Sequence, residues 1–399
     1  MTSSRLPTLK QLESENRRLL RSIAGHAKSR SSPIGQAAFD SACNRFLVSR
    51  AARTLALAKA KGCRNREIDV QAIFCEIKPI RNWQDALAQV PRKVHWVKTP
   101  KRSGGYRQTC SLPMDLKMWN YMTRSILLRT YAPRQHIGHW PKRGRDNQIE
   151  QIRACCGAPG IVAIRADVRD AYGSVRCDAI YEFLDLPAEL IRGAIDARIN
   201  SYEYVGGCSI DAVCSSTHST AGNMEAETAP QGLLQGSPTS DLVFSILLDD
   251  LPDQIPENLA CFSYSDNVIV LSRSEREAQS VSDNLADYFN RHPAGPFVIR
   301  QDIEPLGGCG FDHLGYWFRW DNGVPQDRGR LWVGMNTRNH SRFEKSLEHP
   351  EDFEVTGFDY VRRSFSASTP QALDVYAHQA AEAGLARYAA RMSSASEAS

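Results

Sequence analysis

The segment 260–272 constrains the fold of this chain more than any other part of the sequence. Two apolar residues, Cys261 and Phe262, lead into a short polar segment, and the aliphatic residues 268–271 follow it. This pattern predicts two strands joined by a tight hairpin turn that carries Asp266. Asp and Asn are also common in ordinary turns, so this segment taken alone is more often a hairpin without a chemical role.

A second acidic residue occurs in a matching setting. The segment 161–175 contains another apolar strand, which runs into Asp167 and then reaches Asp170 and Tyr172. Carboxylates at the ends of adjacent buried strands repel each other unless a cation lies between them. Oxygen ligands favour Mg²⁺ or Mn²⁺, and two such ions can clamp an in-line displacement at phosphorus. Asp167 and Asp266 therefore predict a metal-dependent site for phosphoryl chemistry.

In this order, the two segments resemble motifs A and C of the reverse transcriptase palm. Between them, the sequence Gln-Gly-Ser-Pro-Thr-Ser at 235–240 is followed by an apolar helical pattern, which resembles motif B of retron and group II intron enzymes. The resemblance implies that Gln235 and Gly236 let the backbone approach the incoming nucleotide and its template partner. An earlier Pro-Gln-Gly at 230–232 matches the motif less well, because the Ser-Pro-Thr-Ser and the helix follow the later one in register.

The resemblance implies an α+β fold of the right-hand polymerase type. Such a fold has fingers, a palm with an antiparallel sheet backed by helices, and here a short helical thumb. We expect residues 1–90 to form a helical N-terminal extension, residues 91–325 the fingers and palm, and residues 326–399 the helical thumb-like region. A chain of 399 residues is long enough to bury the core of such a unit.

The N-terminal extension is predicted to be helical. One helix is expected over residues 5–24, with a capping box formed by Thr8 and Gln11 at its start and Gly25 at its end. A second, alanine-rich helix is expected over residues 39–61.

A basic segment precedes motif A. Residues 91–113 contain six Lys or Arg residues and no acidic residue, and a Gly-Gly turn separates two predicted strands. Basic hairpins suit contacts with triphosphates and with the template backbone. The segment resembles the fingers motif of reverse transcriptases, which implies that Arg107 lies over the incoming nucleotide and that Lys101 or Arg102 reaches its phosphates. A solvated basic hairpin without a ligand is the alternative.

The resemblance also assigns the metal site. Asp167 and Asp266 are the expected catalytic carboxylates and ligands of two Mg²⁺ ions, with Mn²⁺ as a possible substitute, and the Val168 carbonyl is a further expected ligand. Asn267, the third expected catalytic residue, stands where the family usually has a second Asp. An amide oxygen is a weaker ligand than a carboxylate, so this departure predicts altered metal affinity or metal choice.

Nucleotide selection is assigned to the residues that follow the first carboxylate. The resemblance implies that Asp170, Ala171 and Tyr172 contact the nucleotide. Tyr172 has the position of the steric gate of the family, where an aromatic ring leaves no room for a 2′-hydroxyl and so favours dNTPs. A tyrosine of the hydrophobic core is the alternative.

A later hairpin is expected to hold the primer end. Leu314, Gly315 and Tyr316 resemble the Leu-Gly-Tyr or Leu-Gly-Phe of the primer grip, although a glycine beside aromatic residues is common in hairpins.

Composition adds weaker constraints. The net charge of +4 is too small to indicate a nucleic-acid partner by itself. The eleven cysteines lack zinc-ligand spacing, and no signal peptide or membrane-spanning apolar run occurs. We therefore expect reduced thiols and a cytoplasmic location without membrane contact.

The function implied by the resemblance is RNA-directed DNA polymerisation from dNTPs on an RNA template, with DNA as the product. No maturase, endonuclease or integrase signature follows the palm, which favours a stand-alone bacterial enzyme related to retron, defence-associated "unknown group" or abortive-infection reverse transcriptases. Such an enzyme is expected to act in antiphage defence with a noncoding RNA, and with a partner protein or as a homo-oligomer. A catalytically weak RNA-binding or assembly subunit and an RNA-dependent RNA polymerase remain alternatives.

Overall fold

The structure is a computed structural model of the chain. It describes residues 6–63, 66–88, 92–100, 106–205, 231–321, 330–353 and 355–397. The chain forms two compact units, and each is described here by itself. Unit 1 comprises residues 1–134, 169–249 and 289–298. Unit 2 comprises residues 135–168, 250–288 and 299–399.

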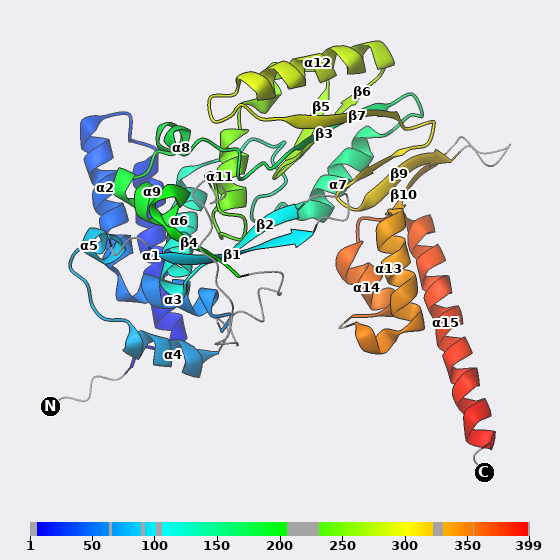
Figure 1. Ribbon diagram of the computed structural model, residues 1–399, viewed down its shortest axis with the longest axis horizontal. Helices are drawn as coiled ribbons and strands as arrows, with labels where there is room; N and C mark the ends of the chain where they lie inside the picture. The colour runs from blue at the N-terminus through cyan, green and yellow to red at the C-terminus, as the bar shows by residue number, and fades with distance from the viewer. Residues whose placement is uncertain are drawn as a thin grey trace. The chain divides into compact units, whose positions relative to one another are not determined.

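Unit 1 is mostly helical and contains one small mixed sheet (Figure 1). Its sheet has the order β2-β1-β4, in which β1 pairs antiparallel with β2 and parallel with β4. The strands are β1 (Lys93–Pro100), β2 (Tyr106–Ser111) and β4 (Ser201–Tyr204). The helices are α1 (Leu9–Ala27), α2 (Pro33–Val48), α3 (Arg50–Ala60), α4 (Glu67–Glu76), α5 (Trp83–Leu87), α6 (Met114–Thr130), α8 (Cys177–Phe183), α9 (Ala188–Ala194) and α11 (Ser240–Leu247), with a 3-10 turn at Ala197–Ile199.

The N-terminal helices differ in part from the sequence prediction. The capping box of α1 is confirmed, because Gln11 N donates to Thr8 Oγ1 at 3.3 Å and Thr8 N donates to Gln11 Oε1 at 2.8 Å. The prediction that Gly25 ends the helix is wrong, because α1 continues through Gly25 to Ala27. Its C-cap residue is Lys28, whose backbone N–H donates to His26 O.

The single helix predicted over residues 39–61 is also wrong, because two helices, α2 and α3, replace it. Ser49 separates them with an extended backbone at φ −60° and ψ 123°. Its hydroxyl accepts from Ala52 N at 3.2 Å and donates to Glu15 on α1 at 2.9 Å. A serine that caps the next helix in this way breaks the helical pattern that its alanine-rich neighbours favour.

Unit 2 is built on an antiparallel sheet with the order β5-β6-β3-β7. The strands are β3 (Val162–Val168), β5 (Ala260–Tyr264), β6 (Asn267–Ser272) and β7 (Ile299–Pro305). Helix α12 (Glu275–Arg291) lies along this sheet in Figure 1, and Ser282 O on it accepts from Gln301 on β7 at 2.8 Å. Only its last three residues belong to unit 1. Helix α7 (Gly144–Cys155) contributes Ile149 and Ile152 to the core of unit 2. The predicted antiparallel sheet backed by helices is confirmed.

A second antiparallel sheet and the C-terminal helices complete unit 2. The remaining strands, in the order β10-β9-β8, are β8 (Phe311–His313), β9 (Tyr316–Asp321) and β10 (Arg330–Met335). The remaining helices are α13 (Thr337–Glu348), α14 (Gly357–Ser364) and α15 (Pro370–Glu397), and 3-10 turns occur at Leu251–Gln254 and Pro350–Asp352. The α+β fold class is therefore as expected. The separate regions 1–90, 91–325 and 326–399 stay predictions, since the two units divide the chain differently.

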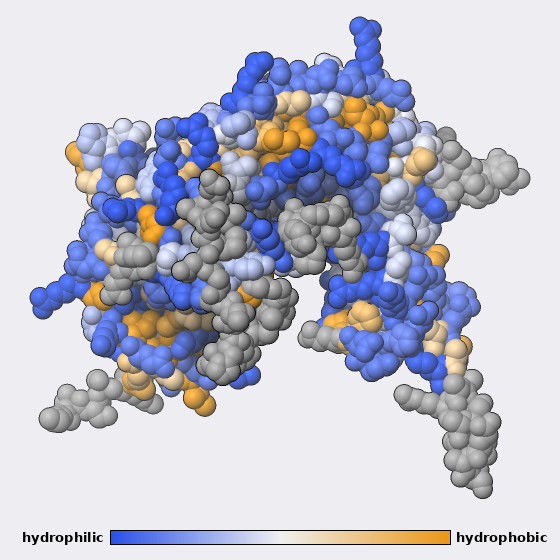
Figure 2. Space-filling view, viewed as in Figure 1, coloured by the Kyte–Doolittle hydropathy of each residue, from blue (hydrophilic) through white to orange (hydrophobic). Residues whose placement is uncertain are grey.

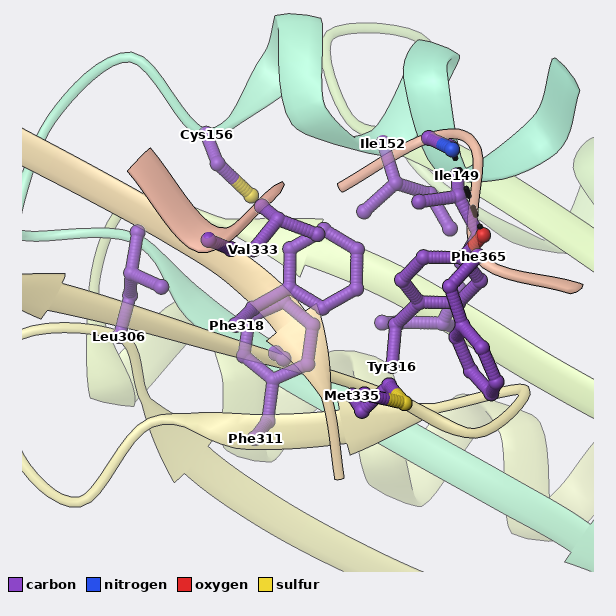
Figure 3. Packing of buried hydrophobic residues seen from close by; sticks show 14 of the residues in the cluster. Ile149, Ile152, Cys156, Leu306, Phe311, Tyr316, Phe318, Val333, Met335 and Phe365 are labelled. Atoms are coloured by element: carbon purple, nitrogen blue, oxygen red, sulfur yellow. Dashed lines mark hydrogen bonds between the residues drawn. The ribbon is translucent and has the colours of Figure 1, made fainter. Parts of the chain in front are cut away.

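Aromatic side chains pack against one another within the core of unit 2 (Figure 3). Phe311 and Phe318 are fully buried and stack with their ring centroids 4.8 Å apart, while Tyr316 meets Phe365 edge to face at 5.1 Å. The surface is largely hydrophilic on the face shown in Figure 2. None of the helices in the described part of the chain has the length and apolarity that crossing a membrane requires.

We predict that Phe311→Ala lowers the free energy of unfolding of unit 2 by about 3–5 kcal/mol, since it leaves a cavity against Phe318. Denaturant titration followed by tryptophan fluorescence measures the change. Leu385→Ala, at a position that is 70% exposed on α15, is the control and should change stability by less than about 0.5 kcal/mol. Equal losses in the two variants would contradict this assignment of the core.

Candidate active site

The pairing of β3 with β6 brings the predicted catalytic residues together. Asp167 is the cross-strand partner of Asn267, and Val168 N donates to the backbone oxygen of Asp266 at 3.2 Å. Asp167 is exposed, whereas the side chains of Ala166 and Val168 are buried. The two predicted carboxylates thus lie at the same end of two neighbouring strands of unit 2.

The hairpin between β5 and β6 has the two-residue turn that the sequence predicts. Tyr264 pairs with Asn267, and only Ser265 and Asp266 lie between them. Ser265 has φ of +57° and is 9% exposed. A positive φ in a two-residue turn matches the twist of the flanking strands, but it is unfavourable for a residue other than glycine. The turn that presents Asp266 therefore holds a strained backbone, which is a common feature of functional sites.

Asn267 acts on Asp266 directly. Its Nδ2 donates to Asp266 Oδ1 at 3.0 Å. A hydrogen bond to a carboxylate oxygen favours the ionised form and fixes the orientation of the group. Asn267, at the position where the resemblance leads us to expect a second acid, thus donates a hydrogen bond to the Asp266 carboxylate.

Residues outside the predicted site support this hairpin through hydrogen bonds to Ser263. Ser263 N donates to His136 O at 2.8 Å, and Gly138 N donates to Ser263 O at 2.8 Å. Gln148 Nε2 donates to the same Ser263 oxygen at 2.9 Å, although Gln148 is 1% exposed. A Cβ on Gly138 would lie 2.6 Å from the side chain of Gln148, so only glycine fits there. A buried glutamine on an amphipathic helix was the signal for this support.

A small pocket of about 70 Å³ opens beside Asp167 in unit 2. It brings Asp167 and Asn267 together with Leu314, the first residue of the predicted primer grip. Its other lining residues are Arg165, Ala166, Val268, Arg300, Asp302, Asp312 and His313. Residues predicted from three separate motifs therefore share one cavity.

The Leu314 hairpin has a second strained turn. Leu314 has φ of +50° and Gly315 φ of +88°, as a two-residue turn of type I′ requires. Gly315 O accepts from Asn336 N at 3.0 Å and from Asn339 Nδ2 at 3.1 Å. A Cβ on Gly315 would lie 2.6 Å from Asn339 Nδ2, so glycine is needed both for its φ and for this close approach.

Tyr316, the last residue of the predicted primer grip, is a core residue in this structure. Its side chain is fully buried, and its hydroxyl donates to Asp146 Oδ1 at 3.0 Å. Burial, and next the negative charge of Asp146, raise the pKa of Tyr316. A direct contact between this side chain and a primer would require the core to open, so its placement favours a supporting role.

In unit 1, residues of the fingers and of motif B meet. In the amide orientation that satisfies both of its ends, Gln235 accepts from Arg107 Nε at 3.2 Å and donates to Gln108 O at 3.0 Å. Cys110 N donates to Gln235 O at 2.7 Å, and a Cβ on Gly236 would lie 2.5 Å from Cys110 O. Arg107 is exposed. Lys101 and Arg102 lie outside the described residues.

Side chains of helix α6 bind the motif B segment through hydrogen bonds and an ion pair. Asn120 is fully buried, and its Oδ1 accepts from the hydroxyls of Ser237 at 2.5 Å and Thr239 at 2.7 Å. One turn later Arg124 pairs with Asp241 at 3.1 Å. A buried asparagine within an apolar helical stripe was the sequence signal for the Asn120 contacts.

The residues after β3 form a compact turn in unit 1. Asp170 is exposed with φ of +47°, Ala171 is buried and Tyr172 is half-buried. The Tyr172 ring meets Phe244 of α11 edge to face at 5.9 Å, and its backbone oxygen accepts from Leu233 N at 2.7 Å. Tyr172 is thus partly exposed and partly packed against Phe244. This intermediate burial suits a side chain that borders a ligand.

Residues 99–294 match the family model described as reverse transcriptase (RNA-dependent DNA polymerase). This chain contains a reverse transcriptase domain. The matched segment includes Arg107, Asp167, Tyr172, Gln235 and Asp266, and it ends before the Leu314 hairpin. Reverse transcriptase domains are RNA-directed DNA polymerases, a class of nucleotidyltransferase.

Other comparisons are more distant. Among solved structures, the chain is similar to apo telomerase from Candida tropicalis truncated from its C-terminal domain, with a TM-score of 0.36 and 11% sequence identity. The likeness covers 57% of this chain and 53% of that chain, so it spans about half the length of the telomerase structure. No curated protein sequence matches the chain.

The carboxylates of the reverse transcriptase domain fit a magnesium site that substrate completes. Among the described residues, no group of three His, Cys, Asp or Glu side chains could hold a metal ion by itself. Mg²⁺ in nucleotide enzymes is commonly held by one or two carboxylates together with substrate phosphates and water. Exposed Asp167 and half-exposed Asp266, with the Val168 carbonyl nearby in the chain, are a donor set of this kind.

Acid is predicted to destabilise unit 2 through His313, which lines the pocket beside Asp167. Burial, and next the charge of Arg165, lower its pKa to about 3, against about 6.5 for an unfolded chain. Between these values the unfolded state binds the proton and the folded state does not, so this contribution to stability falls as pH decreases. Removing the imidazole should reduce the loss of stability from pH 7 to pH 5 by about 2 kcal/mol.

Denaturant midpoints of wild type and His313→Leu at the two pH values measure this difference. His378→Leu replaces a largely exposed histidine of the same unit and should retain the wild-type pH dependence. An unchanged pH dependence in His313→Leu would contradict the prediction.

Proposed function

We propose that the protein is an RNA-directed DNA polymerase that extends DNA from dNTPs by two-metal nucleotidyl transfer at Asp167 and Asp266. The observation that supports this most is the register of β3 against β6, in which Asp167 faces Asn267 and Asp266 is the turn residue directly before Asn267. Two carboxylates at one sheet edge suit Mg²⁺, with Mn²⁺ as an alternative ion. When bound, such ions acidify the attacking 3′-hydroxyl and neutralise the charge of the triphosphate.

The protein side chains would bind and orient the reacting groups. Asn267 orients the Asp266 carboxylate through its 3.0 Å hydrogen bond. Arg107 binds the incoming nucleotide while Gln235 holds its guanidinium in place. Lys101 or Arg102 would add contacts to the phosphates. Asp170 and Ala171 would line the nucleotide site, where the Tyr172 ring excludes a 2′-hydroxyl.

The biological setting is proposed from family resemblance. A bacterial enzyme that copies a noncoding RNA in antiphage defence fits the reverse transcriptase domain and the departure at Asn267. Sequencing of RNA that co-purifies with the protein, and phage challenge of cells that carry wild type or Asp167→Asn, test this assignment. Protection that persists without Asp167 would exclude a role for polymerisation.

Replacement of either carboxylate tests the chemistry. Asp167→Asn and Asp266→Asn should each lower incorporation of labelled dNTPs on a primed RNA template by at least about 100-fold, because each removes a charged metal ligand. The control Asp283→Asn, on the exposed side of α12, should stay within about twofold of wild type. Full activity of Asp167→Asn in Mg²⁺ would contradict the proposal.

Tyr172→Ala tests nucleotide selection. Loss of the ring should reduce the preference for dNTPs over NTPs by at least about tenfold, since the space for a 2′-hydroxyl becomes available. Tyr172→Phe keeps the ring and should keep the preference. Ratios of kcat/KM for the two nucleotide types measure the effect, and equal ratios in Tyr172→Ala and wild type would assign this tyrosine to the core alone.

A catalytically weak RNA-binding or assembly subunit is the second candidate. The observation that favours it is Asn267, which gives the site an amide in place of a carboxylate. In that case Asn267→Asp should raise incorporation, whereas Asp266→Asn should leave the cellular phenotype unchanged.

A further inference from the structure

Arg165 lies close to the proposed catalytic carboxylates but has no part in the chemistry described above. It is the one charged residue in the apolar run of β3 before Asp167, and it precedes Asp167 by two residues. Side chains two apart on a strand point to the same face of the sheet. Arg165 and Asp167 therefore share the face that borders the pocket, and both residues line it.

Arg165 contacts acidic residues of two different sheets. Within its own sheet it pairs with Asp302 at 3.3 Å and with Glu304 at 2.7 Å, both on β7. Its third partner, Asp312, lies on β8 of the other sheet, at 2.5 Å. Arg165 Nη1 also donates to the backbone oxygen of Asp312 at 2.9 Å. One guanidinium thus joins the strand of Asp167 to a different sheet.

The contact to Asp312 reaches the hairpin of the predicted primer grip. Asp312 is two residues before Leu314, and its Oδ2 accepts from Asn336 at 3.2 Å. Asn336 in turn donates its backbone N–H to Gly315 O at 3.0 Å. Asp312 therefore contacts both Arg165 and Asn336, and Asn336 also hydrogen-bonds to the hairpin turn at Gly315.

The burial of Arg165 argues that this link is stable. Its side chain is 22% exposed, so the ion pairs lie in a partly desolvated setting where they are stronger than on an open surface. The planar guanidinium donates hydrogen bonds to the carboxylates of Asp302 and Asp312 and to the Asp312 carbonyl, a set of fixed directions that a lysine cannot reproduce. Its contact with Glu304 is an ion pair without hydrogen-bond geometry.

We propose that Arg165 is a positioning residue that sets the place of the Leu314–Gly315 hairpin relative to Asp167. It thereby determines where the end of a primer lies with respect to the catalytic carboxylates. This inference rests on the proposed polymerase function. A shift of about 1 Å in the reacting groups can lower a rate by on the order of 100-fold, so a residue that touches no substrate can still control the reaction.

The acidic partners provide matched variants. Asp312→Asn weakens the link to the hairpin, whereas Glu304→Gln removes an ion pair of similar length within the palm sheet only. Arg165→Gln removes both links, and Arg165→Lys keeps the charge while losing the fork of donors. If Arg165→Gln fails to fold, the two acidic variants and Arg165→Lys still separate a positioning role from a purely structural one.

Two readouts are needed. Binding of a fluorescent DNA primer annealed to an RNA template is measured by anisotropy, and dNTP incorporation is measured on the same duplex. We expect Arg165→Gln, Arg165→Lys and Asp312→Asn to lower kcat on the duplex, or to raise the KM for the duplex, by on the order of 10- to 100-fold, with the KM for dNTP nearly unchanged. Glu304→Gln, and Arg153→Gln on α7 as a distant ion-pair control, should behave like wild type.

The outcomes separate this inference from the proposed function. Wild-type duplex binding and kinetics in Asp312→Asn and Arg165→Lys would overturn the positioning role while polymerase activity stands. Equal defects in Glu304→Gln and Asp312→Asn would also overturn it, because they assign the cluster to sheet stability. If the wild type binds the duplex, Asp312→Asn weakens that binding and neither protein incorporates dNTPs, the positioning role stands and the proposed polymerase function is overturned. Neither binding nor incorporation by wild type would overturn both.

Discussion

The antiparallel register of β3 against β6 is the constraint on which the candidate site depends. Side chains alternate along a strand, so a slip of one residue would turn Asp167 towards the buried face and Ala166 towards solvent. Burial alternates at the C-terminal end of β3, so that slip would expose the buried side chains of Ala166 and Val168 and bury the charge of Asp167. The hydrophobic core of the sheet thereby selects the register that aligns Asp167 with Asn267.

Unfavourable backbone conformations are concentrated near this site. Among the described residues, the residues other than glycine with positive φ are Lys142, Asp170, Ser265 and Leu314. Three of these four lie in or beside the segments assigned to the carboxylates, the nucleotide and the primer. Such conformations persist only where surrounding contacts hold them. Ser265 is buried, and hydrogen bonds from the chain that leads into α13 and from α13 itself support the turn of Leu314.

The separation along the chain of the residues in contact explains both the successes and the errors of the sequence prediction. The hairpin turn at Asp266 and the capping box of α1 were predictable, because each depends on residues close together in the chain. The break at Ser49 was not, since its hydroxyl competes with helix formation by bonding to Ala52 and to Glu15 on another helix. Gln235 and Arg107 came from separate motifs, and their hydrogen bond could not be derived from either one.

The sequence by itself determined the residue types that carry the chemistry, the local turns that present them and the family to which the matched segment belongs. Only the tertiary structure decided that Asp167 faces Asn267, that Asn267 donates to Asp266, and that Tyr316 is a core residue. It also decided that Arg165 links β3 to the Leu314 hairpin. The physical reason is range: turns and caps arise between neighbours, whereas strand register and ion pairs between sheets depend on how distant segments pack together.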